Sequence, residues 1–190
     1  SFIELYNQST ESVDLTGWRI AYRSSADGDN SESWEYLDLA GSIEGNGYYL
    51  IRCGAANGTD YEVPAGDQDW EIQLHNKGVS VVLLSDQTEL DEAFAGAVTD
   101  ENRPEGYVDL LAVQGNDAED EQMPPVYETA VNADQSKKKS VRRDNFQDTD
   151  NNAEDSSVVD YSEEVPEEEG PHSSSMNESG EPGTDQPGTG

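Results

Sequence analysis

Apolar and polar residues alternate along the first two-thirds of the chain with the period of a β-strand. In residues 18–23, Trp18, Ile20 and Tyr22 fall on one face and two arginines fall on the other. Residues 70–74 repeat the same alternation. Each of these runs therefore predicts a half-buried strand, with one face on a core and one face in water.

Two further runs, residues 79–84 and 107–113, are almost continuously apolar, which predicts strands covered on both faces, with residues 79–84 central in their sheet. Clusters of Gly, Asn and Asp separate the runs, and they lie at residues 27–30, 45–47, 57–58 and 76–78. No helical periodicity is sustained. Short strands joined by such turns predict an all-β sandwich of about seven to nine strands.

The charge of the chain narrows the choice of partners. Among 190 residues, 42 are acidic and 10 are basic, which gives a net charge of −32. Such a surface repels phosphates and anionic lipid, because binding either depends on a field of Lys and Arg. Direct nucleic-acid binding is therefore not expected, with the basic residues 137–143 as the exception. No apolar run approaches the roughly 20 residues needed to cross a bilayer, so no membrane insertion is expected.

Composition also divides the chain into a domain and a tail. Residues 1–161 contain the strand pattern, and within them residues 116–135 are polar and acidic, which predicts a long loop between the last core strands. Residues 162–190 are rich in Glu, Pro, Gly and Ser and lack the apolar side chains that offset the entropy of ordering. We expect them to form a disordered linker.

The single cysteine, Cys53, excludes an internal disulfide framework, so stability has to come from packing. Its place at the end of an apolar run predicts a small buried hydrophobe. Glu4 lies inside an apolar strand, where exposure to solvent, an ion pair with Arg142 or Arg143, or a functional contact are the alternatives.

Several motifs occur in an order that resembles the lamin-tail domain. They are Phe-Ile-Glu-Leu-Tyr-Asn at residues 2–7, Val-Asp-Leu-Thr-Gly-Trp at 13–18, the turn and strand at 39–51, the hairpin at 74–83, and the closing segments 140–143 and 148–155. This family is an immunoglobulin-like sandwich found in nuclear lamins and in secreted bacterial proteins. The resemblance covers residues 1–161. It implies a non-catalytic module, and it also implies that a strand preceding Phe2 is absent and that Ser156 replaces a usual aromatic.

The run Asp148 to Asp155 suggests a cation site, because oxygen ligands alternate as they do in an EF-hand loop. Its sixth position is Ala153 rather than Gly and its twelfth is Val159 rather than Glu, so an EF-hand is excluded. A turn in which Asp and Asn bond their own backbone is the alternative. If calcium binds, the expected ligands are Asp148, Asp150, Asn152 and Asp155, and no other cofactor is expected.

A basic run and two aromatic residues are candidates for contact with a partner. The basic residues are Lys137, Lys138, Lys139, Arg142 and Arg143, which either dock an acidic partner or protect a strand edge from pairing. Trp34 and Tyr36 either form a recognition surface or belong to the core. The partner expected for this set is a protein or a cell-wall or surface component.

The parts needed for catalysis are missing from the sequence. The two histidines are His75, in a predicted turn, and His172, in the predicted linker, and no nucleophile elbow or zinc-binding motif occurs. The sequence therefore predicts a non-enzymatic accessory module of a larger secreted or surface-attached bacterial protein, mediating interaction or spacing domains, located outside the cell or on its surface. The alternatives are a metal-assisted hydrolase using residues 148–155 and a purely structural spacer.

Overall fold

The computed structural model of the chain describes residues 1–25, 33–55, 61–116 and 122–179. The strands are β1 (Phe2–Tyr6), β2 (Val13–Asp14), β3 (Arg19–Ser24), β4 (Glu35–Asp38), β5 (Ser42–Ile43), β6 (Tyr48–Cys53), β7 (Gln68–Trp70), β8 (Val79–Leu84), β9 (Gly96–Val98), β10 (Tyr107–Val113), β11 (Val126–Glu128), β12 (Lys139–Arg143) and β13 (Ser156–Asp160). The short 3-10 helices are η2 (Asp144–Phe146), η3 (Glu167–Glu169) and η4 (Ser174–Ser179). The turns predicted at residues 27–30 and 57–58 lie outside the described residues.

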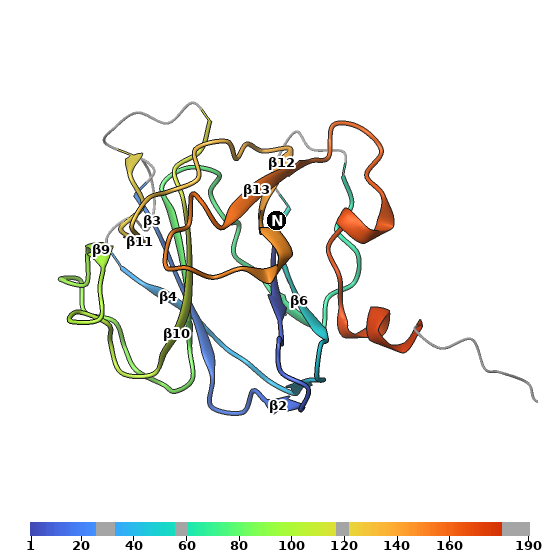
Figure 1. The fold of residues 1–190 in the computed structure, drawn as a ribbon, viewed down its shortest axis with the longest axis horizontal. Helices are drawn as coiled ribbons and strands as arrows, with labels where there is room; N and C mark the ends of the chain where they lie inside the picture. Colours follow the sequence, from blue (N-terminus) through green and yellow to red (C-terminus); the bar gives the residue numbers. More distant parts are fainter. Residues whose placement is uncertain (26–32, 56–60, 117–121, 180–190) are drawn as a thin grey trace, which may run out of the picture.

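Two sheets pack face to face, which confirms the all-β sandwich (Figure 1). A three-stranded sheet has the order β1-β6-β7, and a four-stranded sheet has the order β10-β8-β3-β4. The strand β8 lies inside the four-stranded sheet, as its continuous apolar run predicts. In contrast, β10 is an edge strand among the described residues, and the predicted cover on both faces holds only in part. Residues of the β9–β11 pair and of the loops beside it cover Leu110 and Ala112, whereas Val108 is 42% exposed.

The strand count depends on how the short strands are treated. Of the strands in the described residues, eight have four or more residues, which matches the predicted seven to nine. The others have two or three residues. Of these, β7 is the edge strand of the three-stranded sheet, and the β2–β5 ribbon and the parallel β9–β11 pair lie outside the two main sheets. They follow turns too closely to leave a periodic pattern in the sequence.

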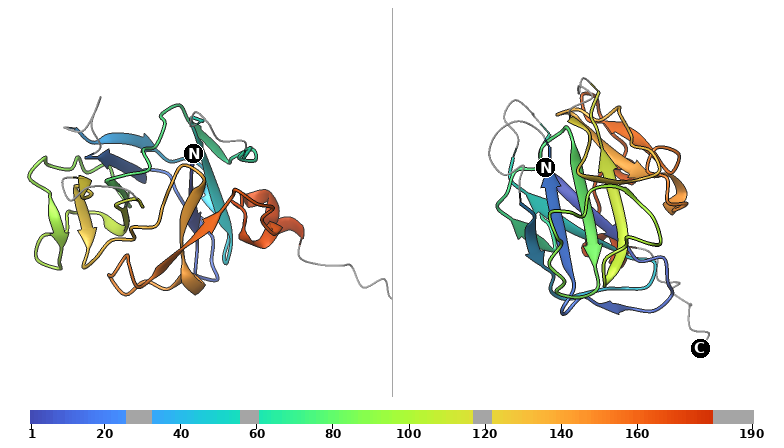
Figure 2. Two further views of the ribbon diagram at one scale, coloured as in Figure 1. Left: turned by 90° about the horizontal axis from the view of Figure 1, so that it is seen from above. Right: turned by 90° about the vertical axis from the view of Figure 1, so that its left-hand side faces the viewer.

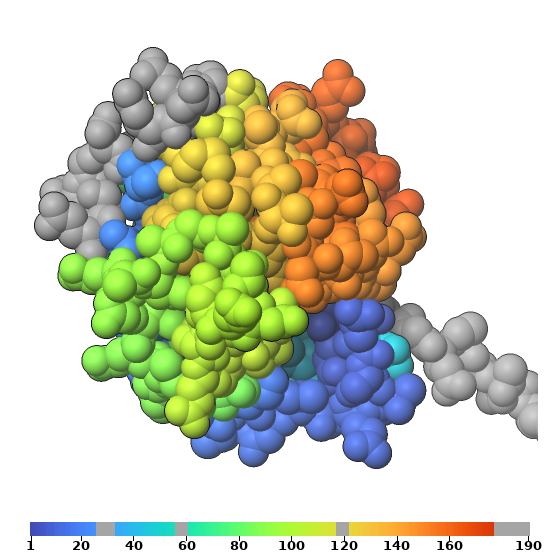
Figure 3. Space-filling view, turned by 60° about the vertical axis from the view of Figure 1, so that its left-hand side comes forward, coloured from blue at the N-terminus to red at the C-terminus, as the bar shows by residue number. Residues whose placement is uncertain are grey.

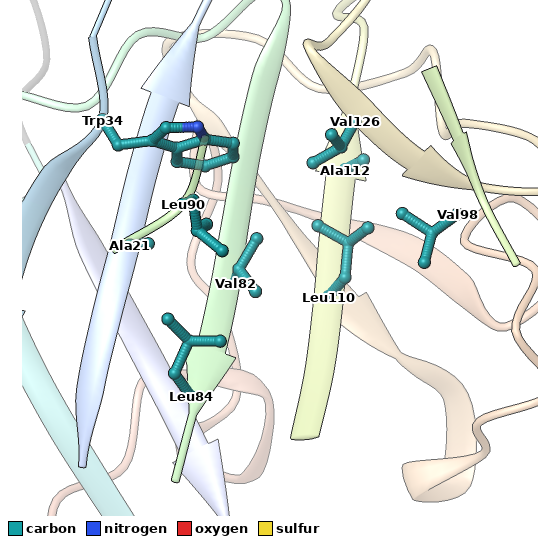
Figure 4. Close-up of a cluster of buried hydrophobic side chains, with 9 residues drawn as sticks. All are labelled: Ala21, Trp34, Val82, Leu84, Leu90, Val98, Leu110, Ala112 and Val126. Atoms are coloured by element: carbon teal, nitrogen blue, oxygen red, sulfur yellow. The ribbon is translucent and has the colours of Figure 1, made fainter. Parts of the chain in front are cut away.

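The four-stranded sheet has apolar residues on both faces. Its inner face meets the three-stranded sheet in a cluster that includes Ile20, Tyr49 and Ile51. Its outer face carries a second cluster of nine buried residues, in which Trp34, Leu90, Val98 and Val126 cover the sheet residues Ala21, Val82, Leu84, Leu110 and Ala112 (Figure 4). Because side chains alternate between the two faces of a strand, β8 and β10 contribute residues to both sides of the sheet.

The segment Val13 to Trp18 shows how sequence sets local structure. The Asp14 side chain accepts a hydrogen bond from the Thr16 N–H at 2.8 Å, and the Trp18 N–H donates to the Leu15 carbonyl at 2.9 Å. Gly17 is the third residue of this turn and has a φ of 85°, a conformation that favours glycine. The turn delivers the chain into β3.

Two expected elements differ in the structure. The run 70–74 is not a continuous strand, because β7 ends at Trp70, although Trp70 and Leu74 still pack against the inner core. The predicted loop 116–135 contains β11, which pairs in parallel with β9 and supplies the buried Val126. The Ser80 hydroxyl holds β11 in place, since it donates to the Val126 carbonyl at 2.7 Å.

The first part of the predicted linker lies against the sandwich. His172 is buried, its ring lies 4.6 Å from that of Tyr48, and its backbone N–H donates to the Glu4 carboxylate at 2.5 Å. The backbone N–H of Ser174 donates to Asp67 at 3.0 Å. Residues 162–179 therefore lie against the sandwich, where a disordered linker is expected, and both polar contacts and the ring contact of His172 with Tyr48 hold them. Residues 180–190 lie outside the described residues. No helix among the described residues has the length and apolar character required to cross a bilayer.

Candidate functional site

A cleft of about 1090 Å³ lies between the two sheets in the described part of the molecule. It opens along the side of the sandwich where β1 ends one sheet and β10 ends the other. The hairpin β12–β13 lies beside β1 at this opening (Figure 2), and in the space-filling view the orange hairpin region stands directly above the blue N-terminal residues (Figure 3). We call this hollow the inter-sheet cleft.

The floor of the inter-sheet cleft is apolar. Ile3 and Leu5 line it from β1, Val81 and Leu83 from β8, and Leu111 from β10. All five side chains are half-buried, whereas their neighbours deeper in the same core, such as Ile20, are fully covered. The cleft is therefore an incompletely filled part of the inner core. Apolar pockets of this size are the usual binding sites of proteins.

Two strands present an unpaired edge to the cleft. Within the described residues β1 pairs with β6 alone and β12 pairs with β13 alone, and every residue of both β1 and β12 lines the cleft. A strand edge of this kind exposes a row of backbone N–H and C=O groups to an incoming chain.

Side chains tie the hairpin to both sheets at the mouth of the cleft. Arg142 of β12 donates to the Glu4 carboxylate of β1 at 3.1 Å. Arg143 of β12 pairs with Asp109 of β10 and donates to the Leu110 carbonyl at 3.1 Å. The ion pair with Arg142 is one of the alternatives that the sequence left open for Glu4. These two arginines are engaged inside the fold and leave little of their charge for a partner.

The lysines of the basic run are arranged differently from its arginines. Lys137 and Lys138 are exposed and line the cleft, and neither has a salt bridge to another described residue. Lys139 lies 3.9 Å from Asp160 on the paired strand β13. The predicted interaction run thus divides into two structural arginines and an exposed basic end.

The two aromatic candidates lie away from this run. Trp34 is 7% exposed and belongs to the outer cluster, which favours the core over the recognition surface as its place. Tyr36 packs against the same cluster, its hydroxyl accepts a hydrogen bond from the Leu90 N–H at 2.7 Å, and the Arg19 guanidinium stacks 4.7 Å from its ring centre. Both aromatics therefore serve the core, which was the alternative that the sequence left open.

The segment Asp148 to Asp155 has the geometry of a turn closed by its own side chains. The buried Asp155 carboxylate accepts hydrogen bonds from the Thr149 N–H at 2.7 Å, the Gln147 amide at 2.9 Å and the Asn151 N–H at 3.3 Å. Although desolvation acts to raise it, these hydrogen bonds lower the pKa of Asp155 to about 2. The carboxylate is therefore committed to the turn.

The other three expected calcium ligands do not point to one centre. Asn152 is buried and its amide donates to the Leu110 carbonyl at 2.8 Å and to Glu128 at 2.9 Å. Asp150 pairs with Arg103, and Asp148 lies 3.3 Å from Arg143. Calcium at this turn remains a prediction, and any ion there has to compete with these partners.

The structure instead gathers a set of carboxylates around Arg143 that sequence reasoning missed. Asp109, Glu128 and Asp148 each offer an oxygen, and these atoms lie within 4.8 Å of one another. The Arg143 guanidinium reaches all three, with Glu128 at 3.8 Å, so a protein cation already lies against the cluster. The available signal was an acid inside an apolar strand, as Asp109 is within residues 107–113.

Burial shifts the acids of this cluster. Glu128 is 1% exposed, and its burial raises the pKa to about 7, with the charges of Asp109 and Asp148 adding to the effect. The Tyr107 hydroxyl, which donates to Glu128, and the charge of Arg143 act in the opposite direction. Burial likewise raises the pKa of Asp109. The cluster therefore holds three acidic side chains close together against a single arginine.

Comparison with known proteins adds no relative. No protein family matches the chain, and a search of curated proteins finds no match either.

Proposed function

We propose that this chain is a non-catalytic interaction module of the lamin-tail type, belonging to a larger secreted or surface-attached bacterial protein. The order of the sequence motifs supports the family, and the all-β sandwich is the fold that such a family implies. The location outside the cell follows from the same resemblance. The activity proposed is the binding of a protein partner rather than chemistry.

The inter-sheet cleft is the observation that carries the binding role. It leaves half-buried apolar side chains and two strand edges open on one side of the sandwich. Exposed apolar surface of this extent commonly marks a site of protein contact. The acids gathered around Arg143 share that cation within the fold, and Glu128, whose pKa is raised to about 7, is only 1% exposed.

Site-directed photocrosslinking tests this function. A photoreactive amino acid replaces Val108, which is 42% exposed and lines the cleft, and in a control it replaces Glu101, which is exposed and does not line it. Each protein is irradiated with secreted and surface proteins of the organism that makes the chain. We expect saturable crosslinking from position 108 that excess unlabelled chain competes away, and none from position 101.

Two other outcomes would replace the proposal. Equal or unsaturable labelling from both positions would favour a structural spacer. Metal-dependent turnover of phosphoester or glycan substrates that is lost in Asp150→Ala, a variant of a residue outside the cleft, would favour a metal-assisted hydrolase.

A further inference from the structure

The inter-sheet cleft is bordered by two strands that lack a neighbour on the side where they face it. β1 and β12 have five residues each, and their side chains meet without a described backbone ladder between them. Adjacent strands lie about 4.8 Å apart, so a strand placed between two others needs about twice that distance between them. Glu4 and Arg142 bridge the strands through long side chains, which is the reach expected across such a space.

The hydrogen-bonding groups of both edges are set by the pairs they already make. In β1, the Ser1 carbonyl accepts from the Cys53 N–H and the Asn7 N–H donates to Gly47, both at 2.9 Å. Bonded positions alternate in an antiparallel ladder, so the backbone groups of Phe2, Glu4 and Tyr6 point to the open side.

The same reasoning applies to β12. The Lys138 carbonyl accepts from the Tyr161 N–H at 2.8 Å, and the Asp144 N–H donates to Asp155 at 2.7 Å. The backbone groups of Lys139, Val141 and Arg143 therefore point away from β13, and these three residues line the cleft. The Lys139 N–H already donates to the Ser136 carbonyl at 3.1 Å. The edge of β12 therefore offers Val141, Arg143 and the Lys139 carbonyl to an inserted strand, and the edge of β1 offers three residues.

The two sides of the inserted strand would meet different surroundings. Glu4 lies opposite Ile3 and Leu5 in the alternation of β1, so its ion pair with Arg142 crosses the outside of the space. The inner side is left to Ile3, Leu5 and Leu111, which accept apolar side chains. Alternate residues of the occupant are therefore apolar.

The charges at the cleft favour a particular sequence at one end of a bound segment. On a chain with a net charge of −32, the exposed ends of Lys137 and Lys138 at the cleft are a local basic site. An acidic flank gains from these lysines, whereas the rest of the surface repels it and so steers it to this position.

We propose that the inter-sheet cleft binds one extended segment of a partner protein, apolar at alternate positions and acidic at one end. The segment adds as a strand between β1 and β12 and joins the three-stranded sheet to the hairpin. Main-chain hydrogen bonds to both edges supply affinity, and the alternating side chains supply specificity. This inference rests on the proposed binding function and specifies the class of partner.

Fluorescence anisotropy with synthetic peptides tests the inference. The probe is a labelled heptapeptide in which valine alternates with threonine, extended by two aspartates at one end. A matched peptide has the same side chains but carries N-methyl groups on alternate residues, which removes the N–H donors of one edge. We expect saturable binding of the first peptide and a loss of about tenfold or more for the second, because several main-chain hydrogen bonds disappear.

Two variants locate the site. Lys138→Glu is expected to weaken the aspartate-tailed peptide about threefold to tenfold, because a cleft charge is reversed. Lys77→Glu makes the same change in net charge at a residue that does not line the cleft, and it is expected to leave binding unchanged. Hydrogen exchange provides a direct readout, since bound peptide is expected to protect the amides of Glu4 and Val141.

The outcomes separate this inference from the proposed function. Equal binding of the N-methylated peptide, or no protection of the Glu4 and Val141 amides, would overturn strand insertion. If no peptide binds while position 108 still crosslinks saturably to a protein, strand insertion fails and the interaction module stands. If neither peptide binding nor crosslinking occurs, both fail.

Discussion

The two faces of the four-stranded sheet are covered to different extents. On the outer face, Leu110 is 0% exposed because residues of the loops around β9 and β11 cover it. On the inner face, Leu111 is half-buried and lines the inter-sheet cleft. These two leucines are neighbours in β10, so strand propensity and hydrophobicity are the same for both. The difference lies in what covers each face.

The outer and inner apolar clusters differ in how completely the chain itself fills them. The outer cluster closes within the chain, and its cover includes a tryptophan, Trp34, over the sheet. The inner cluster closes around Ile20 and Ile51 but stays open towards β1. One sheet therefore borders a core that is filled by the chain itself and a core that is only partly filled. In the proposed function, the partly filled core receives the partner.

The largest effect is expected from removing the guanidinium of Arg143, which contacts carboxylates of β10, of β11 and of the turn 148–155. Arg143→Ala leaves Asp109, Glu128, Asp148 and the Asp155 carboxylate without their cation. Removing one partner of a buried ionic network costs about 3–5 kcal/mol. Urea denaturation measures the loss of unfolding free energy.

Arg52→Ala is the matched control for that variant. Arg52 also forms an ion pair, with Asp69 at 2.8 Å, but both side chains are largely exposed. We expect a loss below about 1 kcal/mol, as for other surface pairs. Equal losses in the two variants would show that the carboxylates around Arg143 do not depend on it.

A pair of leucine truncations measures the difference between the faces. Leu110→Ala removes a fully covered side chain, and we expect a loss of about 3 kcal/mol. Leu111→Ala removes a side chain that already borders a hollow, so less packing is lost and we expect about 1 kcal/mol. Urea denaturation of both variants provides the test, and a larger loss for Leu111 would mean that the cleft is filled in solution.

The sequence predicts the strands of the four-stranded sheet better than it predicts what covers each face of that sheet. Alternation identifies the strands with one face in the core, and the apolar run 79–84 identifies the central strand β8. It does not reveal the cleft, because Leu111 and Leu110 look alike in a sequence. An open face depends on the order of strands in the sheets, which is a property of long-range pairing.

The candidate site is predictable in part for a related reason. The basic run is visible as sequence, but the division between Arg143, which is 15% exposed, and the exposed Lys138 depends on contacts with β10. Trp34 is of a residue type that is common at recognition surfaces, but a loop that lies far away in the chain buries it. Glu128 lies in a stretch that reads as an acidic loop, and its burial follows from the pairing of β11 with β9.

The last effect expected is a pH dependence of stability that comes from Glu128, beside the covered outer face of the sheet. The pKa of Glu128 is raised from 4.5 to about 7 in the folded state, so between these values the folded chain holds more protons than the unfolded chain. Stability therefore decreases as the pH rises through this window and is constant above it. Glu128→Gln removes the titration, so the melting temperature of the variant relative to the parent is expected to increase from pH 4.5 to pH 7.

Asp155→Asn gives the opposite dependence and serves as the control. The folded-state pKa of Asp155 is lowered from 3.8 to about 2, so its contribution is present above pH 3.8 and is lost as the pH falls through 2. Its variant should lose a constant amount of stability between pH 4.5 and pH 7, the window of Glu128. Melting curves that shift in parallel for both variants across that window would contradict the assignment of the titration to Glu128. The titrating group would then have to lie outside the residues that cover the outer face of the four-stranded sheet.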